Sequence, residues 1–184
     1  MYLDKLEVEV QSPLPGQTDF YVKNADILFL NKLRRIILRD IPTMAVDSSD
    51  IKVNTSSLYN ELLYHRLTMI PIKADPRKYS EDDIITFKLK CKGHIGITSI
   101  YSRDLEWVPK DGQEPVKPVH DNILIVKLAP GQEIDMELYC KKGTGSMHTK
   151  WSPAHAFHNK NVLAIKSYGI YTPEELFEEA VKLT

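Results

Sequence analysis

The feature that most constrains this chain is a helical segment with an unusually wide apolar face, at residues 25–40. Asn24 is positioned as its N-cap, Asp26 lies in its first turn, and Pro42 ends it. Its apolar side chains fill one face and extend onto the flanks: Phe29, Leu30, Leu33, Ile36, Ile37 and Ile41, with Ile27, Leu28 and Leu38 beside them. Lys32, Arg35 and Arg39 gather on the opposite side. A surface helix usually needs an apolar stripe only ~100° wide. The pattern therefore predicts a helix covered by more than its own sheet.

The rest of the sequence is mostly β in character. Strands are predicted at Leu6–Val10, Phe20–Val22, Ile84–Lys90, Ile95–Tyr101, Ile123–Leu128, Ile134–Cys140 and Val162–Lys166, with a turn at Ser12–Gly16 and a second helix at Leu58–Leu67 capped by Ser56 or Ser57. A last helix opens with Thr172-Pro173-Glu174-Glu175, a capping box with proline at the first helical position. The order predicts an α+β fold in which a β-rich block is inserted into a sheet-and-helix layer.

Composition excludes several classes of protein. The chain has 184 residues and a net charge of −1, from 24 basic and 25 acidic side chains, whereas an autonomous nucleic-acid-binding domain is usually basic. Cys91 and Cys140 are too few for an all-cysteine zinc site or an iron–sulfur cluster. Neither a signal-peptide core nor an apolar run of about 20 residues is visible. We expect an intracellular protein with no membrane partner.

A search for catalytic chemistry finds no complete motif. The run Lys142–Ser146 has the wrong glycine spacing for a phosphate-binding loop. His148, His155 and His158 lie near Cys140, so a zinc site is conceivable, but solvated or hydrogen-bonded histidines are the more common case. The acidic residues of the last helix suit its N-terminal dipole rather than acid–base work. We predict no catalytic, cofactor-binding or metal-binding residues, and an enzyme ranks third among the possible functions.

Three stretches carry a resemblance to a known family. The first is Asn31-Lys-Leu-Arg-Arg-Ile-Ile-Leu-Arg-Asp-Ile-Pro-Thr-Met-Ala-Val-Asp47, a helix followed by a turn. The second is Asn54-Thr-Ser-Ser-Leu-Tyr-Asn-Glu-Leu-Leu-Tyr-His-Arg-Leu-Thr-Met-Ile-Pro-Ile72. The third begins at Ile100-Tyr-Ser-Arg-Asp-Leu105 and ends in Lys142-Gly-Thr-Gly-Ser-Met-His-Thr-Lys-Trp-Ser-Pro153. Together they resemble the alpha-like subunits of cellular RNA polymerases: the archaeal alpha-like subunit, the third subunit of RNA polymerase II, and the alpha-like subunit shared by polymerases I and III.

The resemblance implies a dimerisation domain, residues 1–48 plus 154–184, interrupted by an inserted β-rich domain at 49–153. It implies a non-catalytic assembly scaffold of a DNA-directed RNA polymerase. Such a scaffold pairs with a smaller alpha-like subunit, docks the large catalytic subunits, and meets nucleic acid only through the complex. The alternative is a self-pairing scaffold of the bacterial alpha type.

The resemblance and the apolar pattern together suggest two interfaces. The dimer interface is expected at Leu30, Leu33, Ile37, Leu176, Phe177 and Ala180, although these residues could instead be internal core. Contact with a large subunit is expected at Asn31, Arg34, Arg35, His65, Arg66, Lys150 and Trp151, although the basic helix face could simply be solvated.

Two departures from the family bear on cofactors and origin. Many relatives carry cysteine clusters for zinc or iron–sulfur, and since this sequence lacks those cysteines no cofactor is expected. The segment from Pro153 to Val162 and the final helix are shorter than is usual. This compactness is typical of proteins encoded by a reduced genome, such as that of a large DNA virus. We expect the protein in the cytoplasm or the nucleus, or in the virion if it is viral.

Overall fold

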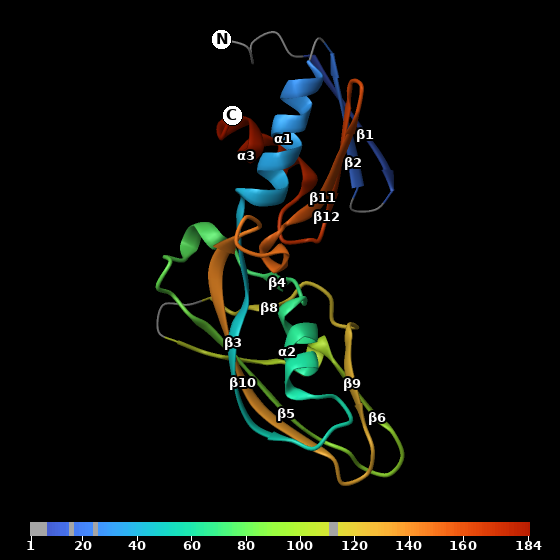
Figure 1. The fold of residues 1–184 in the computed structure, drawn as a ribbon, viewed down its shortest axis with the longest axis vertical. Helices are drawn as coiled ribbons and strands as arrows, with labels where there is room; N and C mark the ends of the chain where they lie inside the picture. Colours follow the sequence, from blue (N-terminus) through green and yellow to red (C-terminus); the bar gives the residue numbers. More distant parts are fainter. Residues whose placement is uncertain (1–6, 15–16, 24–25, 111–113) are drawn as a thin grey trace. The chain divides into compact units, whose positions relative to one another are not determined.

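The computed structural model describes residues 7–14, 17–23, 26–110 and 114–184. They form two compact units, which we call unit 1 (residues 1–43 and 144–184) and unit 2 (residues 44–143) (Figure 1). The insertion was expected at residues 49–153. Residues 144–153 group with unit 1 because the Ser146 amide donates to the Arg39 carbonyl over 2.9 Å, and Gly145 lies against the Leu38 carbonyl.

Unit 1 contains a four-stranded antiparallel sheet in the order β1-β2-β12-β11. The strands are β1 (Glu7–Leu14), β2 (Gln17–Lys23), β11 (Ala154–Asn159) and β12 (Val162–Ser167). Phe20 pairs with Leu163, and Ala156 pairs with Ile165, so these buried side chains share one face of the sheet. A turn was predicted at Ser12–Gly16, but β1 continues to Leu14, so the prediction is wrong for residues 12–14. Residues 15–16, and Leu6 at the start of the first predicted strand, lie outside the described residues.

Two helices, α1 (Ile27–Arg39) and α3 (Pro173–Lys182), cover that face of the unit 1 sheet (Figure 1). The Phe20 and Phe177 rings stack with centroids 4.5 Å apart. The capping box of α3 is confirmed: the Thr172 hydroxyl accepts from the Glu175 amide over 3.2 Å, and the Glu175 carboxylate accepts from the Thr172 amide over 2.8 Å. Asp26 occupies the N-cap position of α1 rather than its first turn, and its side chain makes no capping hydrogen bond; Asn24 lies outside the described residues.

Unit 2 is built on a second antiparallel sheet, in the order β3-β10-β5-β7. Its strands are β3 (Pro42–Asn54), β5 (Ile85–Lys92), β7 (Glu106–Val108) and β10 (Glu133–Thr144). Two small pairs, β4 (Ile72–Lys73) with β8 (Lys117–Pro118) and β6 (Thr98–Tyr101) with β9 (Leu124–Leu128), and helix α2 (Asn60–Thr68) complete it. Short 3-10 turns lie at Pro76–Lys78 and Ser102–Asp104, and a third, Thr149–Trp151, belongs to unit 1. The α+β prediction is confirmed.

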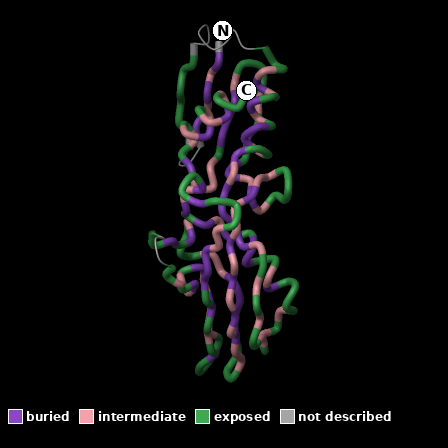
Figure 2. Tube along the Cα trace, turned by 90° about the vertical axis from the view of Figure 1, so that its left-hand side faces the viewer, coloured by how far each residue is buried: buried purple, intermediate pink, exposed green. Residues whose placement is uncertain are grey.

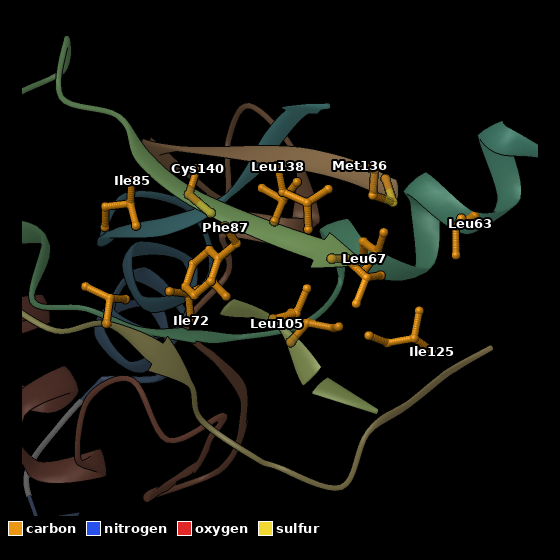
Figure 3. Packing of buried hydrophobic residues seen from close by; sticks show 14 of the residues in the cluster. Leu63, Leu67, Ile72, Ile85, Phe87, Leu105, Ile125, Met136, Leu138 and Cys140 are labelled. Atoms are coloured by element: carbon orange, nitrogen blue, oxygen red, sulfur yellow. The ribbon is translucent and has the colours of Figure 1, made fainter. Parts of the chain in front are cut away.

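The core of unit 2 lies between its large sheet and α2. Figure 3 shows Leu63 and Leu67 of α2 beside Met136 and Leu138 of β10, with the Phe87 ring among its buried neighbours. Along β10 the inward residues Ile134, Met136, Leu138 and Cys140 are buried, and the residues between them are partly exposed. Figure 2 shows buried, intermediate and exposed residues along the traces of both units.

The outward side of this sheet carries cross-strand ion pairs. Glu133, Asp135 and Glu137 of β10 lie opposite Lys92, Lys90 and Lys88 of β5, with nitrogen–oxygen distances of 3.9, 3.1 and 3.6 Å. Lys52 of β3 reaches Glu137 from the other side at 2.9 Å. Opposite charges at paired positions favour this strand register.

Two further predictions need correction. Helix α2 begins at Asn60 with Tyr59 as its N-cap, not after Ser56 or Ser57, because the Ser56 hydroxyl donates to the Asn54 side chain over 2.7 Å in a preceding turn. The turn expected at Ile41–Ala45 is instead the start of β3. Pro42 opens that strand, where a missing N–H is tolerated, and the residues from Thr43 to Val46 are buried.

Candidate functional site

The residues expected at a dimer interface lie mainly in the core of unit 1. Leu30, Leu33 and Ile37 of α1 are fully buried, and so are Leu176 and Ala180 of α3. The sheet of unit 1 covers them, so they offer no surface to another chain, and their expected role is corrected to that of core residues. Phe177 remains half-buried and packs flat on Phe20.

Two of the exposed apolar side chains of unit 1, Leu28 and Leu183, line a groove beside α1. Leu28 is 71% exposed and Leu183, just after α3, is 54% exposed. A groove of about 460 Å³, which we call the α1 groove, is lined by Leu28, Asn31, Lys32, Arg35, Ile36, Arg39, Asp40 and Leu183. The Lys32 ammonium donates to the Thr184 carbonyl over 2.6 Å, so the end of the α3 segment is held against α1.

The α1 groove changes in character along the helix. Leu28, Lys32, Arg35 and Arg39 follow one another at intervals of three or four residues, so they form one stripe on a helix. The stripe is apolar near Leu28 and cationic toward Arg39, and Asp40 is its one acidic lining residue. Within the described part of the chain, no ion pair involves Arg35 or Arg39. The groove therefore offers both apolar area and free guanidinium groups to a partner.

Arg34 and Asn31 have a more local role than predicted. The Arg34 guanidinium donates twice to the Asn31 side-chain oxygen, over 3.2 and 2.9 Å, and is partly buried. Arg35 is exposed and lines the α1 groove. Of the paired arginines, Arg35 is thus the one available to another chain.

In unit 2, His65 and Arg66 border a second hollow. It has a volume of about 290 Å³ and is lined by His65, Arg66, Met69, Ile70, Ile123, Leu124 and Ile125; we call it the α2 groove. The Arg66 guanidinium donates to the carbonyls of Leu124 and Ile125 over 2.7 and 2.8 Å. Arg66 thereby fastens α2 to β9 although it is itself exposed, and His65 is also exposed at the rim.

Trp151 is a structural residue rather than an exposed contact. Its side chain is 5% exposed, and its carbonyl accepts from the Thr43 hydroxyl over 2.8 Å. The Lys150 ammonium lies 4.2 Å from the Trp151 ring centroid, a cation–π contact. The expected large-subunit contact is corrected for Trp151, because the ring packs within unit 1.

The histidines and cysteines of the sequence are separated in the fold. His148 Nδ1 accepts from the Lys150 amide over 3.1 Å, and His155 packs edge-on against Tyr168. Cys91 and Cys140 form no disulfide among the described residues, and burial raises the pKa of the Cys91 thiol to about 11. Among the residues that the structure describes, no group of three His, Cys, Asp or Glu side chains is placed to hold a metal ion. None of the helices in those residues is long and apolar enough to cross a membrane.

Sequence reasoning missed Leu28, Leu183 and Asp40 as members of a site. The spacing of Lys32, Arg35 and Arg39 already indicated a basic side of the first helix. Leu28 could be assigned only to the flank of that helix, and nothing in the local sequence places Leu183 beside it. That proximity depends on how α3 packs against α1.

Comparison with known proteins places the chain in a family. Residues 41–168 match the model of the RNA polymerase Rpb3/RpoA insert domain. The chain is 38% identical over 176 residues to subunit rpac1 of DNA-directed RNA polymerases I and III from Dictyostelium discoideum, covering 83% of this chain and 51% of that protein. The human RPAC1 subunit is 36% identical over 166 residues, covering 73% of this chain and 48% of its own length.

An archaeal relative is matched over more of its length. Subunit Rpo3 of the DNA-directed RNA polymerase of Methanocaldococcus jannaschii is 36% identical over 173 residues, or 91% of this chain and 85% of the archaeal one. By contrast, the chain spans about half the length of the eukaryotic relatives. The blocks from Asn31 to Pro153, the two-unit fold and these matches agree: the chain belongs to the alpha-like subunit family of multisubunit DNA-directed RNA polymerases.

Proposed function

We propose that this chain is a non-catalytic assembly subunit of a DNA-directed RNA polymerase, which pairs with a smaller alpha-like subunit and docks the large catalytic subunits. The observation that carries the proposal is the α1 groove. It combines the exposed Leu28 and Leu183 with the cations Lys32, Arg35 and Arg39 on one stable helix. Membership of the alpha-like family supports the same assignment.

The apolar end of the α1 groove serves the smaller partner in this proposal. Leu28 and Leu183 line this groove and are exposed, so a partner helix laid there would bury apolar area that unit 1 leaves open to solvent. Removing apolar surface from water contributes roughly 25 cal/mol per Å². This replaces the interface predicted from Leu30, Leu33 and Ile37, and keeps unit 1 as the dimerisation domain.

The cationic end of the same groove serves a large subunit. Arg35 and Arg39 have no ion-pair partner among the described residues, and arginine suits bidentate contact with carboxylates across an interface. In unit 2, the exposed His65 at the α2 groove offers a second place where a large subunit could dock. Docking through both units would divide the contact between the dimerisation domain and the insert.

A heterodimer agrees better with the groove than a self-paired scaffold does. In an isologous homodimer the same patch meets itself. Two copies of the α1 groove would bring Lys32, Arg35 and Arg39 of one chain against the same cations of the other, which costs free energy when the interface is dry. A partner with acidic side chains avoids this repulsion.

Co-expression tests the proposal. The full chain should be produced with the smaller alpha-like subunit of the same source and, in a second arm, with the large subunits as well, and each complex weighed by native mass spectrometry. We expect a one-to-one heterodimer and then a larger assembly. A stable dimer of this chain alone, formed in the presence of the smaller subunit, would contradict the heterodimer.

A substitution separates the two contacts. Arg35→Ala should leave the heterodimer intact and weaken recruitment of the large subunit about tenfold, because Arg35 lies toward the cationic end of the groove. Lys160→Ala, an exposed cation at the turn between β11 and β12, is the matched control and should change neither step. Normal recruitment by the Arg35 variant would refute the docking role.

A further inference from the structure

The loop between β5 and β6 exposes two isoleucines to solvent. Ile95 is 103% exposed and Ile97 is 74% exposed, and Gly96 stands between them at φ 80°. We call residues 93–98 the β5–β6 tip; it joins the neighbouring ends of β5 and β6 in Figure 1. Single exposed apolar residues are ordinary, but two at the end of one loop form a projecting apolar patch of the kind that marks an interaction site.

The base of the tip is firmly held, so the isoleucines project from a defined support. The Gly93 amide donates to the Gln132 carbonyl over 2.7 Å, and the Gly131 amide donates to the Gly93 carbonyl over 3.2 Å. The His94 amide donates to the Thr98 hydroxyl over 3.2 Å and closes the loop. A projection fixed at both ends loses little conformational freedom on binding, which favours contact with a partner.

The charge around the tip indicates the chemistry of that partner. From Leu89 to Ile100 the sequence holds no acidic residue but contains Lys90, Lys92 and His94. Lys127, on β9 opposite Ser99, is exposed and has no ion pair within the described part of the chain. Lys90 and Lys92 are paired across the strands, with Asp135 at 3.1 Å and Glu133 at 3.9 Å. Lys127 is therefore the cation left for a partner, and an apolar tip beside it complements an apolar hollow with an acidic side chain at its rim.

We propose that the β5–β6 tip is a further docking element, which inserts Ile95 and Ile97 into an acid-rimmed apolar pocket of another protein subunit of the polymerase. The proposal rests on the function proposed above. Two isoleucines and their neighbours cover far less than the roughly 800 Å² per partner of a stable interface. The tip therefore acts in an assembly that other surfaces already hold together, where a weak second contact gains from high effective concentration.

Competitive incorporation tests the tip in the complex. Wild-type chain and a variant are co-expressed in equal amount with the other subunits, the polymerase is purified through a large subunit, and the ratio of the two chains is measured by mass spectrometry. Ile95→Asp/Ile97→Asp should be incorporated about tenfold less than wild type. Ile95→Val/Ile97→Val, which keeps the branched apolar shape, should be incorporated almost equally. Both pairs alter only exposed side chains, so the free chain should stay folded.

Each outcome decides the proposal. Equal incorporation of the Asp pair would overturn the tip while leaving the proposed function in place. Failure of the wild-type chain to enter any polymerase would overturn both. Flotation with vesicles of phosphatidylcholine and phosphatidylserine forms a separate arm: wild-type binding that the Asp pair abolishes would assign the tip to a lipid surface and exclude the protein pocket.

Discussion

Unit 1 and unit 2 solve the same packing problem in different ways. Each buries one face of an antiparallel sheet under helices. In unit 2 the opposite side of the sheet carries cross-strand ion pairs, and the Arg66 guanidinium donates its hydrogen bonds to carbonyls of β9. In unit 1 an ion pair between Lys182 and Glu179, at 3.0 Å, lies within α3, and the arginines of the α1 groove have no ion-pair partner among the described residues.

Under the proposed function, this difference indicates where contacts with partners would be concentrated. Charges that are paired inside a unit have little to gain from another chain, whereas free arginines beside exposed leucines gain from both charge and apolar contact. In unit 1, the α1 groove presents exposed leucines and, within the described part of the chain, arginines without ion-pair partners along one side of a helix. In unit 2 such contacts would be confined to the α2 groove and to the β5–β6 tip.

The largest expected effect separates core from surface on α1. Leu33→Asp places an unpaired carboxylate at a fully buried position and should destabilise unit 1 by more than about 4 kcal/mol. Leu28→Asp changes an exposed position and should alter the free energy of unfolding by about 0.5 kcal/mol or less, yet abolish pairing with the smaller subunit. Urea unfolding and co-purification measure the two effects. An equal loss of unfolding free energy in the two variants would show that Leu28 belongs to the core as Leu33 does.

The next effect tests whether the units can be destabilised one at a time. A Cβ at Gly145 would lie 1.9 Å from the Leu38 carbonyl oxygen in unit 1, and a Cβ at Gly93 would lie 2.0 Å from the Ala129 carbonyl oxygen in unit 2. Each Gly→Ala change should cost about 2–3 kcal/mol because backbone must move. Gly96→Ala, in open space at φ 80°, is the control and should cost about 1 kcal/mol.

The two tryptophans make this measurement specific. Trp151 belongs to unit 1 and Trp107 to unit 2, so single-tryptophan variants carrying Trp107→Phe or Trp151→Phe report the fluorescence of one unit each. Gly145→Ala should lower the urea midpoint of the Trp151 signal, and Gly93→Ala that of the Trp107 signal. Identical shifts of both signals in both variants would show that the units unfold as one.

A smaller effect distinguishes a structural arginine from a binding one. Arg66→Ala removes two hydrogen bonds to the carbonyls of Leu124 and Ile125 and should destabilise unit 2 by about 1–2 kcal/mol. Arg66→Lys should recover only part of that loss, because an ammonium lacks the planar fork. Arg35→Ala should leave the midpoint of the Trp151 signal unchanged within about 0.5 kcal/mol. Loss of stability in the Arg35 variant would place Arg35 in the fold rather than at the interface.

The parts of the fold that sequence reasoning predicted are those fixed by local chemistry. The capping box at Thr172 requires only four consecutive residues, and it begins α3 where predicted. Strand β3 was missed because Thr43–Val46 are buried in succession, which breaks the alternation that identifies a strand. Strand β11 was missed because histidines and small residues hide its alternation.

The candidate site was predictable to the same degree. Helical spacing identifies Lys32, Arg35 and Arg39 as one basic side, because that depends only on 3.6 residues per turn. Periodicity also shows that Leu33 is covered, but not whether a sheet of the same chain or a partner covers it. The nearness of Leu28 and Leu183 arises from residues far apart in the sequence, and no local pattern contains it.

The smallest expected effect is a difference in acid sensitivity between the units. In the described residues, the carboxyls whose pKa is held below its ordinary value, Asp75, Asp83 and Glu137, all belong to unit 2. For Glu137 the main cause is the hydrogen bond from the Lys52 ammonium, 2.9 Å away, opposed by desolvation. A carboxyl with a lowered folded pKa adds stability that is fully present above its unfolded pKa, near 4.3, and is lost as pH falls through the folded pKa.

Unit 2 should therefore lose more stability than unit 1 when the pH is lowered from about 5 to 3. The loss should be modest because these pairs are exposed and screened by solvent. Urea midpoints of the Trp107 and Trp151 signals at several pH values measure it, and Glu137→Gln should flatten part of the Trp107 dependence because glutamine has no proton to gain. Raising the salt concentration should also flatten the pH dependence of the Trp107 midpoint, because salt weakens the ion pairs that are present at neutral pH. If the Trp151 signal proved equally acid-sensitive, the ion pairs on the outward face of unit 2 would not account for the difference between the units.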